Sequence, residues 1–185
     1  MIKGREYVKR SKKVVFLSHC ILFQSIRAYG VSLRFSSAVR PVVELLIEND
    51  INLIQMPCPE MPYDGVIRKA VRKDIYDNPR FRKICSKYAT QIINMMRDLS
   101  EAGFKIVGVL GIENSPTCGV RFVFREGKGR VNEPGIFIEE LQKLLLAENF
   151  KQIPFLGIKT FNMKKSLSEL GDILKQTSLM RYSTS

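Results

Sequence analysis

Short apolar runs rich in β-branched residues recur along the chain, each bounded by turn or loop residues. Three of them, at 14–18, 51–56 and 105–110, are typical of buried parallel strands. A fourth run, at 153–158, contains Pro154, which favours a sheet edge or the start of a strand. The pattern predicts a sheet of about four strands.

Helical periodicity fills the segments between these runs. Apolar residues from Val39 to Ile47 predict a helix with Pro41 in its first turn, capped by Ser36 or Ser37. A longer helix is expected over 79–102, ending at Gly103, with a core-facing stripe of Ile84, Tyr88, Ile92, Met95 and Leu99. Two more helices are expected, over 135–147 and from about Ser166 onward.

Strands that alternate with helices imply right-handed βαβ crossovers and a parallel sheet with helices on both faces. We therefore expect a small Rossmann-like, doubly wound α/β fold. Residues 120–131 alternate aromatic and charged side chains around a glycine-containing turn, which predicts a flap-like hairpin. We expect a single domain, with a core at 14–158, a basic N-terminal extension at 1–13, and a C-terminal helix and tail at 159–185.

Composition places this chain of 185 residues among globular proteins, because 45% of its residues are hydrophobic and 26% are charged. The apolar stretch after the basic N-terminus is interrupted by Ser18 and His19, unlike a signal peptide, and no run is long enough for a membrane span. We expect a cytoplasmic protein without a membrane partner, whose thiols stay reduced.

Three of the four cysteines lie just past the carboxyl ends of predicted strands. Cys20 comes after the first strand, Cys58 after the second and Cys118 after the third. Ligands of open parallel sheets bind at the carboxyl ends of the strands, so the topology brings these residues to one crevice. The pattern predicts a shared metal site, whereas Cys85 lies on the apolar stripe of the long helix and is interpreted as structural.

Three thiolates suit either zinc or an iron-sulfur cluster. The only histidine is His19, and neighbours on a strand point to opposite faces, so His19 is not expected to share an ion with Cys20. We interpret it as a buried residue hydrogen-bonded beneath the site. One coordination position then stays open, as in catalytic metal sites.

The net charge of +12 favours anionic partners. The basic clusters at 9–13, 68–73 and 80–83 are most simply solvated helix faces. They could also attract a nucleotide or RNA, although no aromatic RNA-binding motif accompanies them.

The segments around the cysteines resemble the thiouracil desulfurase family, and more closely a divergent branch of desulfidases within it. The resemblance extends over about residues 14–158 and lies in these segments: 18–22 (SHCIL), 27–30 (RAYG), 55–60 (QMPCPE), 108–112 (GVLGI), 115–120 (SPTCGV) and 135–141 (GIFIEEL). The better-studied branch has Cys-Arg-Tyr-Asp-Gly where this chain has residues 26–30 (IRAYG). That difference concerns the substrate rather than metal binding.

The resemblance implies a 4Fe-4S cluster held by Cys20, Cys58 and Cys118, with one iron free to take sulfur from a thiocarbonyl substrate. It also implies acid-base or positioning roles for Glu60 and Ser115. Arg27 and Asn114 are further candidates for holding a heterocycle or an anion. Because an iron without a protein thiolate is exposed to oxidants, we expect the cluster to be lost or degraded in protein handled in air.

The leading hypothesis is a non-redox desulfidase that removes sulfide from a thiolated small molecule, a heterocycle like thiouracil. A second hypothesis is a basic module that binds thiolated tRNA or carries sulfur on its cluster. A third is a zinc hydrolase that uses the same cysteine site. Zinc and acid-labile sulfide in anaerobically purified protein distinguish the first hypothesis from the third.

Overall fold

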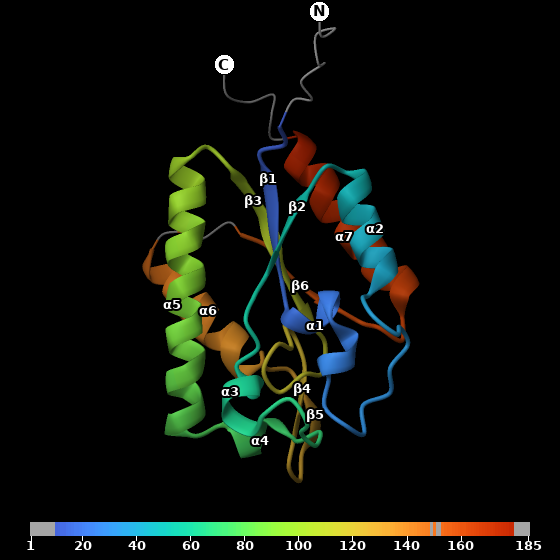
Figure 1. Cartoon of the computed structure of the whole chain (residues 1–185), viewed down its shortest axis with the longest axis vertical. Helices are drawn as coiled ribbons and strands as arrows, with labels where there is room; N and C mark the ends of the chain where they lie inside the picture. The colour runs from blue at the N-terminus through green and yellow to red at the C-terminus, as the bar shows by residue number, and fades with distance from the viewer. Residues whose placement is uncertain (1–9, 149, 151–152, 180–185) are drawn as a thin grey trace, which may run out of the picture.

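The computed structural model describes residues 10–148, 150 and 153–179 of the chain. Its main sheet consists of four parallel strands in the order β2-β1-β3-β6 (Figure 1). These are β1 (Lys13–Leu17), β2 (Asn52–Gln55), β3 (Lys105–Ile112) and β6 (Phe155–Ile158). All four predicted strands are confirmed, and β6 lies at an edge directly after Pro154, as that proline predicted.

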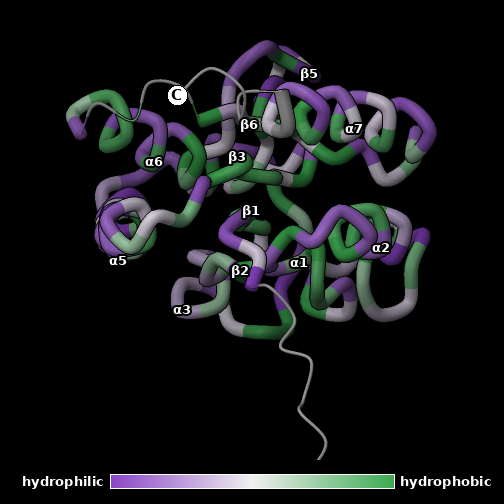
Figure 2. Tube along the Cα trace, turned by 90° about the horizontal axis from the view of Figure 1, so that it is seen from above, coloured by the Kyte–Doolittle hydropathy of each residue, from purple (hydrophilic) through white to green (hydrophobic). Residues whose placement is uncertain are grey.

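Helices cover both faces of this sheet (Figures 1 and 2). One face carries α5 (Pro79–Glu101) and α6 (Ile136–Ala147), and the other carries α2 (Arg40–Glu48) and α7 (Met163–Leu179). Side chains alternate along β1, so Phe16 joins the core on the α5–α6 side while Val15 and Leu17 join the core on the α2–α7 side. The predicted doubly wound α/β fold is confirmed.

The long helix α5 has the predicted ends but a different buried face. Asn78 caps it by accepting a hydrogen bond from the Phe81 N–H (3.0 Å), and Gly103 follows it with φ +78°. The predicted stripe is wrong at Met95, which is 41% exposed. Because α5 packs along α6 as well as on the sheet, its fully buried positions are instead Phe81, Cys85, Ala89, Ile92, Ile93 and Met96.

The predicted serine caps are also wrong. Helix α2 begins at Arg40, with Val39 as its N-cap residue and no capping side chain. The preceding backbone is held against residues 21–24 by two hydrogen bonds, Gln24 N to Ser37 O (2.5 Å) and Val39 N to Ile21 O (2.7 Å). Helix α7 begins at Met163, before Ser166, whose hydroxyl accepts a hydrogen bond from the Lys159 N–H (2.9 Å).

The predicted hairpin is confirmed as β4 (Val123–Arg125) paired with β5 (Gly129–Val131). Sequence analysis did not predict four short elements: α1 (His19–Leu22), a 3-10 turn η1 (Gln24–Ile26), α3 (Glu60–Asp64) and α4 (Lys73–Tyr76). Most of these lie with the hairpin at the end of the sheet where the strands terminate (Figure 1). Among the described residues no helix is long and apolar enough to cross a membrane. Residues 1–9 of the predicted extension and 180–185 of the predicted tail lie outside the described residues.

Candidate functional site

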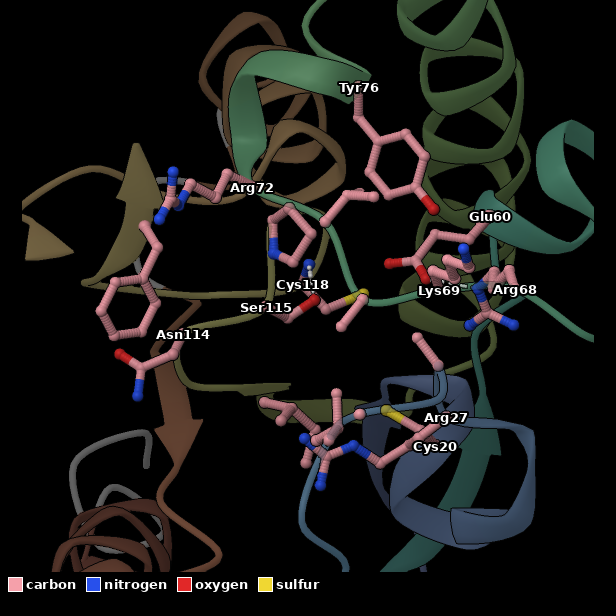
Figure 3. A pocket seen from close by; sticks show the side chains of 18 of the residues that line it. Cys20, Arg27, Glu60, Arg68, Lys69, Arg72, Tyr76, Asn114, Ser115 and Cys118 are labelled. Atoms are coloured by element: carbon pink, nitrogen blue, oxygen red, sulfur yellow. Dashed lines mark hydrogen bonds and ion pairs between the residues drawn. The ribbon is translucent and has the colours of Figure 1, made fainter. Parts of the chain in front are cut away.

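A cavity of about 790 Å³ lies beyond the carboxyl ends of β1, β2 and β3 (Figure 3). Its position follows the general rule for open parallel sheets, and its volume lies within the range of small-molecule sites. Every residue that the sequence predicted for the site lines it: Cys20, Arg27, Cys58, Glu60, Asn114, Ser115 and Cys118. The fold therefore brings together residues from three separate parts of the chain.

Each of the three cysteines lies in the segment that follows the carboxyl end of a strand. Cys20 lies in the first turn of α1, Cys58 lies between β2 and α3, and Cys118 lies in the loop that follows β3. Two glycines let the Cys118 loop approach its neighbours closely. A Cβ on Gly111 would lie 2.1 Å from the Cys118 carbonyl oxygen, and a Cβ on Gly135 would lie 2.4 Å from the Thr117 carbonyl carbon.

The three thiols share one electrostatic environment. Burial raises the pKa of Cys20 to about 12, and Arg27 partly offsets this effect. Burial also raises the pKa of Cys118, and the charges of Cys20 and Cys58 raise it further. The metal-free thiols are therefore protonated at neutral pH, and binding of a metal would release their protons.

The three cysteines are the type of ligand that holds iron-sulfur clusters in proteins. No group of three His, Cys, Asp or Glu side chains among the described residues could hold one metal ion as it stands. A cluster differs because its thiolate ligands bind separate iron atoms. The cavity wall holds Cys20, Cys58 and Cys118, whereas Cys85 is fully buried in the core beside α6, as its interpretation as structural required.

The interpretation of His19 needs two corrections. His19 and Cys20 belong to helix α1 rather than to a strand, so strand alternation does not separate them. His19 is half-buried and lines the cavity instead of lying beneath it. Burial lowers its pKa, while a backbone hydrogen bond with Met56 acts in the opposite direction.

Glu60 lies at the start of α3 in a buried ion pair that sequence analysis missed. The Arg68 Nε donates to Glu60 Oε2 (2.7 Å), its Nη1 donates to the Ile26 carbonyl (2.9 Å), and its Nη2 lies 3.8 Å from Cys58 Sγ. Figure 3 shows the Glu60 carboxylate reaching from its helix into the cavity. The arginine thus connects a predicted metal ligand with a predicted catalytic carboxylate.

The interpretation of the basic cluster at 68–73 as a solvated face is therefore wrong in part. Arg68 is 7% exposed and Lys73 is 3% exposed. Lys73 Nζ lies 3.2 Å from Glu133 and 3.5 Å from Glu139. The local sequence does not indicate that Arg68 or Lys73 is buried, because their carboxylate partners lie in other segments of the chain.

The Ser115 hydroxyl is already engaged with the backbone of the cysteine loop. Its Oγ accepts hydrogen bonds from the N–H groups of Thr117 (3.3 Å) and Cys118 (3.0 Å). Both contacts use oxygen lone pairs, so the hydroxyl proton remains available to an acceptor in the cavity. Ser115 therefore suits donation of a hydrogen bond rather than abstraction of a proton.

Three further polar side chains face the cavity. Arg27 has a buried Nη1 that finds no hydrogen-bond partner among the described residues, and burial lowers its pKa. Asn114 accepts a hydrogen bond from Arg130 through Oδ1 (3.0 Å), which leaves its NH₂ group to donate. Burial and the charge of Glu60 raise the pKa of Tyr76, which was not predicted, so its phenol stays protonated.

No family model matches the sequence. The uncharacterized protein MJ0003 of Methanocaldococcus jannaschii is 33% identical over 135 residues, which are 73% of this chain and 81% of that protein. The chain belongs to the family of MJ0003. Membership of the MJ0003 family does not assign an activity.

Among solved structures, the 4Fe-4S-dependent thiouracil desulfidase TudS has a TM-score of 0.49 and 16% identity to this chain. The match covers 86% of this chain and 98% of the TudS chain.

Proposed function

We propose that this protein is an iron-sulfur-dependent desulfidase that removes sulfide, without net oxidation or reduction, from a thiocarbonyl heterocycle similar to thiouracil. The observation that carries the proposal is the convergence of Cys20, Cys58 and Cys118 on one cavity that also holds Glu60. The sequence resemblance described above supports the same cofactor. The three thiolates would hold a 4Fe-4S cluster that has no fourth protein ligand.

When bound, such a cluster would supply an open, thiophilic iron that polarises the C=S bond and makes its carbon electrophilic. The remaining chemistry falls to side chains of this protein. Glu60 would take a proton from an attacking water, or attack the carbon itself. Arg68 holds Glu60 Oε2, which fixes the orientation of the carboxylate.

The other cavity residues would bind the heterocycle. The Ser115 hydroxyl would donate a hydrogen bond to an acceptor on the ring. The NH₂ group of Asn114 would donate a hydrogen bond to a ring oxygen or nitrogen. Arg27 pairs with negative charge that develops on the substrate. In the hydrolysis, a C–O bond forms from water, the C–S bond breaks, and sulfur leaves as hydrogen sulfide.

Anaerobic purification followed by metal, sulfide and activity measurements tests the proposal. We expect iron together with acid-labile sulfide, and release of hydrogen sulfide from 2-thiouracil or a related thio-heterocycle. Zinc without acid-labile sulfide would remove the desulfidase and leave the zinc hydrolase. A cluster without turnover, combined with a salt-dependent gel shift of tRNA, would instead favour the thiolated-tRNA alternative.

A further inference from the structure

The mouth of the cavity carries large apolar side chains that remain exposed. Phe124 of β4 is 43% exposed, Phe161 in the turn before α7 is 60% exposed, and Ile75 of α4 is 61% exposed. All three line the cavity although they come from separate elements. Single exposed apolar residues need no explanation, but a group around one cavity is typical of a binding surface.

Phe124 is held in place by its neighbour in the hairpin. Val123 is fully buried, so strand alternation turns Phe124 to the opposite face of β4, toward the cavity. Arg125 then ties the hairpin down through ion pairs with Glu133 (2.8 Å), Asp77 (3.2 Å) and Asp74 (3.3 Å). The ring is thus presented on a fixed backbone, which lowers the entropy cost of binding against it.

Phe122, which lies two residues before Phe124, has a ring that is already covered by a cationic side chain. The guanidinium of Arg130 lies 3.7 Å from the centre of the Phe122 ring and covers that face. Among the described residues neither Phe124 nor Phe161 has a ring or cation partner of this kind. Neither ring is therefore already stacked on an aromatic or cationic side chain, and both are partly exposed.

We propose that Phe124 and Phe161 form a stacking surface that makes the cavity select flat aromatic rings over puckered ones with the same polar groups. Offset or edge-to-face contacts between aromatic rings add to the area that they bury. We expect loss of either ring to weaken binding of a flat pyrimidine by about 3- to 10-fold. The inference rests on the proposed function for the reaction, but the selection itself is a property of binding.

The test compares uracil with 5,6-dihydrouracil, which keeps the polar groups of uracil but has a puckered, non-aromatic ring. Binding of both to the anaerobically purified full chain is measured by calorimetry. We expect wild type to prefer uracil, Phe124→Ala and Phe161→Ala each to weaken uracil binding, and the double variant to lose the preference. Phe124→Tyr should keep the preference, whereas Phe124→Leu, which is apolar but has no ring, should lose part of it.

Leu146→Ala is the matched control, because Leu146 is 63% exposed on α6 and does not line the cavity. Wild type that binds uracil no tighter than dihydrouracil, or a Phe124→Leu variant equal to Phe124→Tyr, would overturn the stacking surface. Release of sulfide from 2-thiouracil is followed in the same preparation. Intact ring selection without sulfide release would overturn the proposed reaction and leave the stacking surface in place.

Discussion

At the scale of single residues, Arg68 connects three parts of the site. Its guanidinium donates hydrogen bonds to the Glu60 carboxylate and the Ile26 carbonyl and lies 3.8 Å from Cys58 Sγ. The planar guanidinium of arginine has several N–H donors that can reach these acceptors at once. The compact ammonium group of a lysine could not reach all of them. The ion pair with Glu60 is almost fully buried, so neither charge can be removed without leaving the other uncompensated. The geometry of the proposed catalytic carboxylate of Glu60 is therefore coupled to that of Cys58, a proposed cluster ligand.

The assignment of the cysteines predicts two groups of variants. Replacing Cys20, Cys58 or Cys118 by Ser should abolish cluster binding, because serine is a poor substitute for a thiolate ligand. Cys85→Ser serves as the matched control and should keep the cluster, since Cys85 is buried in the core away from the cavity. Iron and acid-labile sulfide per chain are the measurements. Loss of iron from Cys85→Ser would show that the ligand set is wrong.

Glu60→Gln separates binding from chemistry. The amide oxygen can still accept the hydrogen bond of Arg68, but the basic carboxylate is gone and the charge of Arg68 is no longer compensated. We expect the cluster to remain and turnover of 2-thiouracil to fall by about 100-fold or more, the usual scale for a positioned acid-base group. Anaerobic sulfide release measures the rate. Full activity would reject the role of Glu60 while leaving the cluster assignment untouched.

Ser115→Ala removes the proposed donor and also the acceptor for the backbone N–H groups of Thr117 and Cys118. We expect the iron content to be kept and activity to fall by a smaller or similar factor. The variant is informative when both quantities are measured on one preparation. Loss of iron would show that Ser115 acts mainly by holding the Cys118 loop.

At the scale of elements, the sequence was informative where a pattern repeats. The strands and the hairpin were predictable from apolar runs and turn residues, and all three ligand candidates could be placed at strand ends. Helices α1, α3 and α4 were missed because four or five residues are too few to display a 3.6-residue period. Arg68 was missed because charge alone suggests the surface, and its burial depends on tertiary contacts with Glu60.

The hairpin depends on carboxylates whose pKa values lie below their usual range. The hydrogen bond with Arg125 lowers the pKa of Glu133, and the backbone N–H of Glu126 lowers that of Asp74. Because these values are lower in the folded state, the stabilisation is present above the unfolded pKa, near 4, and is lost as the pH falls through the folded values. We expect the hairpin to detach from α4 as the pH falls below about 4 and through these lowered folded values.

NMR signals of Phe124 and the hairpin backbone follow this detachment, with signals from β1 and β3 as the internal reference. Glu133→Gln should cause similar changes in the hairpin at pH 7, because it removes one of the ion-pair partners of Arg125. Hairpin signals that stay unchanged while the carboxyl groups of Glu133 and Asp74 titrate and the sheet remains folded would show that apolar contacts, rather than this network, hold the hairpin.

At the scale of the whole molecule, helices cover opposite faces of the sheet (Figure 1), and each face has its own apolar core. The cavity lies beyond the carboxyl ends of the strands. A chain of this length buries roughly 70% of its unfolded surface, so its stability does not require a metal. We expect the cluster-free protein to unfold cooperatively on heating. Cluster binding should add stability, because a group that binds only the folded state shifts the folding equilibrium.

Thermal unfolding followed by circular dichroism tests this expectation on cluster-loaded protein, on the same protein after removal of the cluster by a chelator, and on Cys58→Ser. The chelated protein and Cys58→Ser should show one cooperative transition each, at similar temperatures and below that of the loaded protein. Cys85→Ser controls for the loss of a thiol. If instead the chelated protein and Cys58→Ser lose cooperative unfolding, the cluster is structural, because the two apolar cores then cannot hold the sheet together without it.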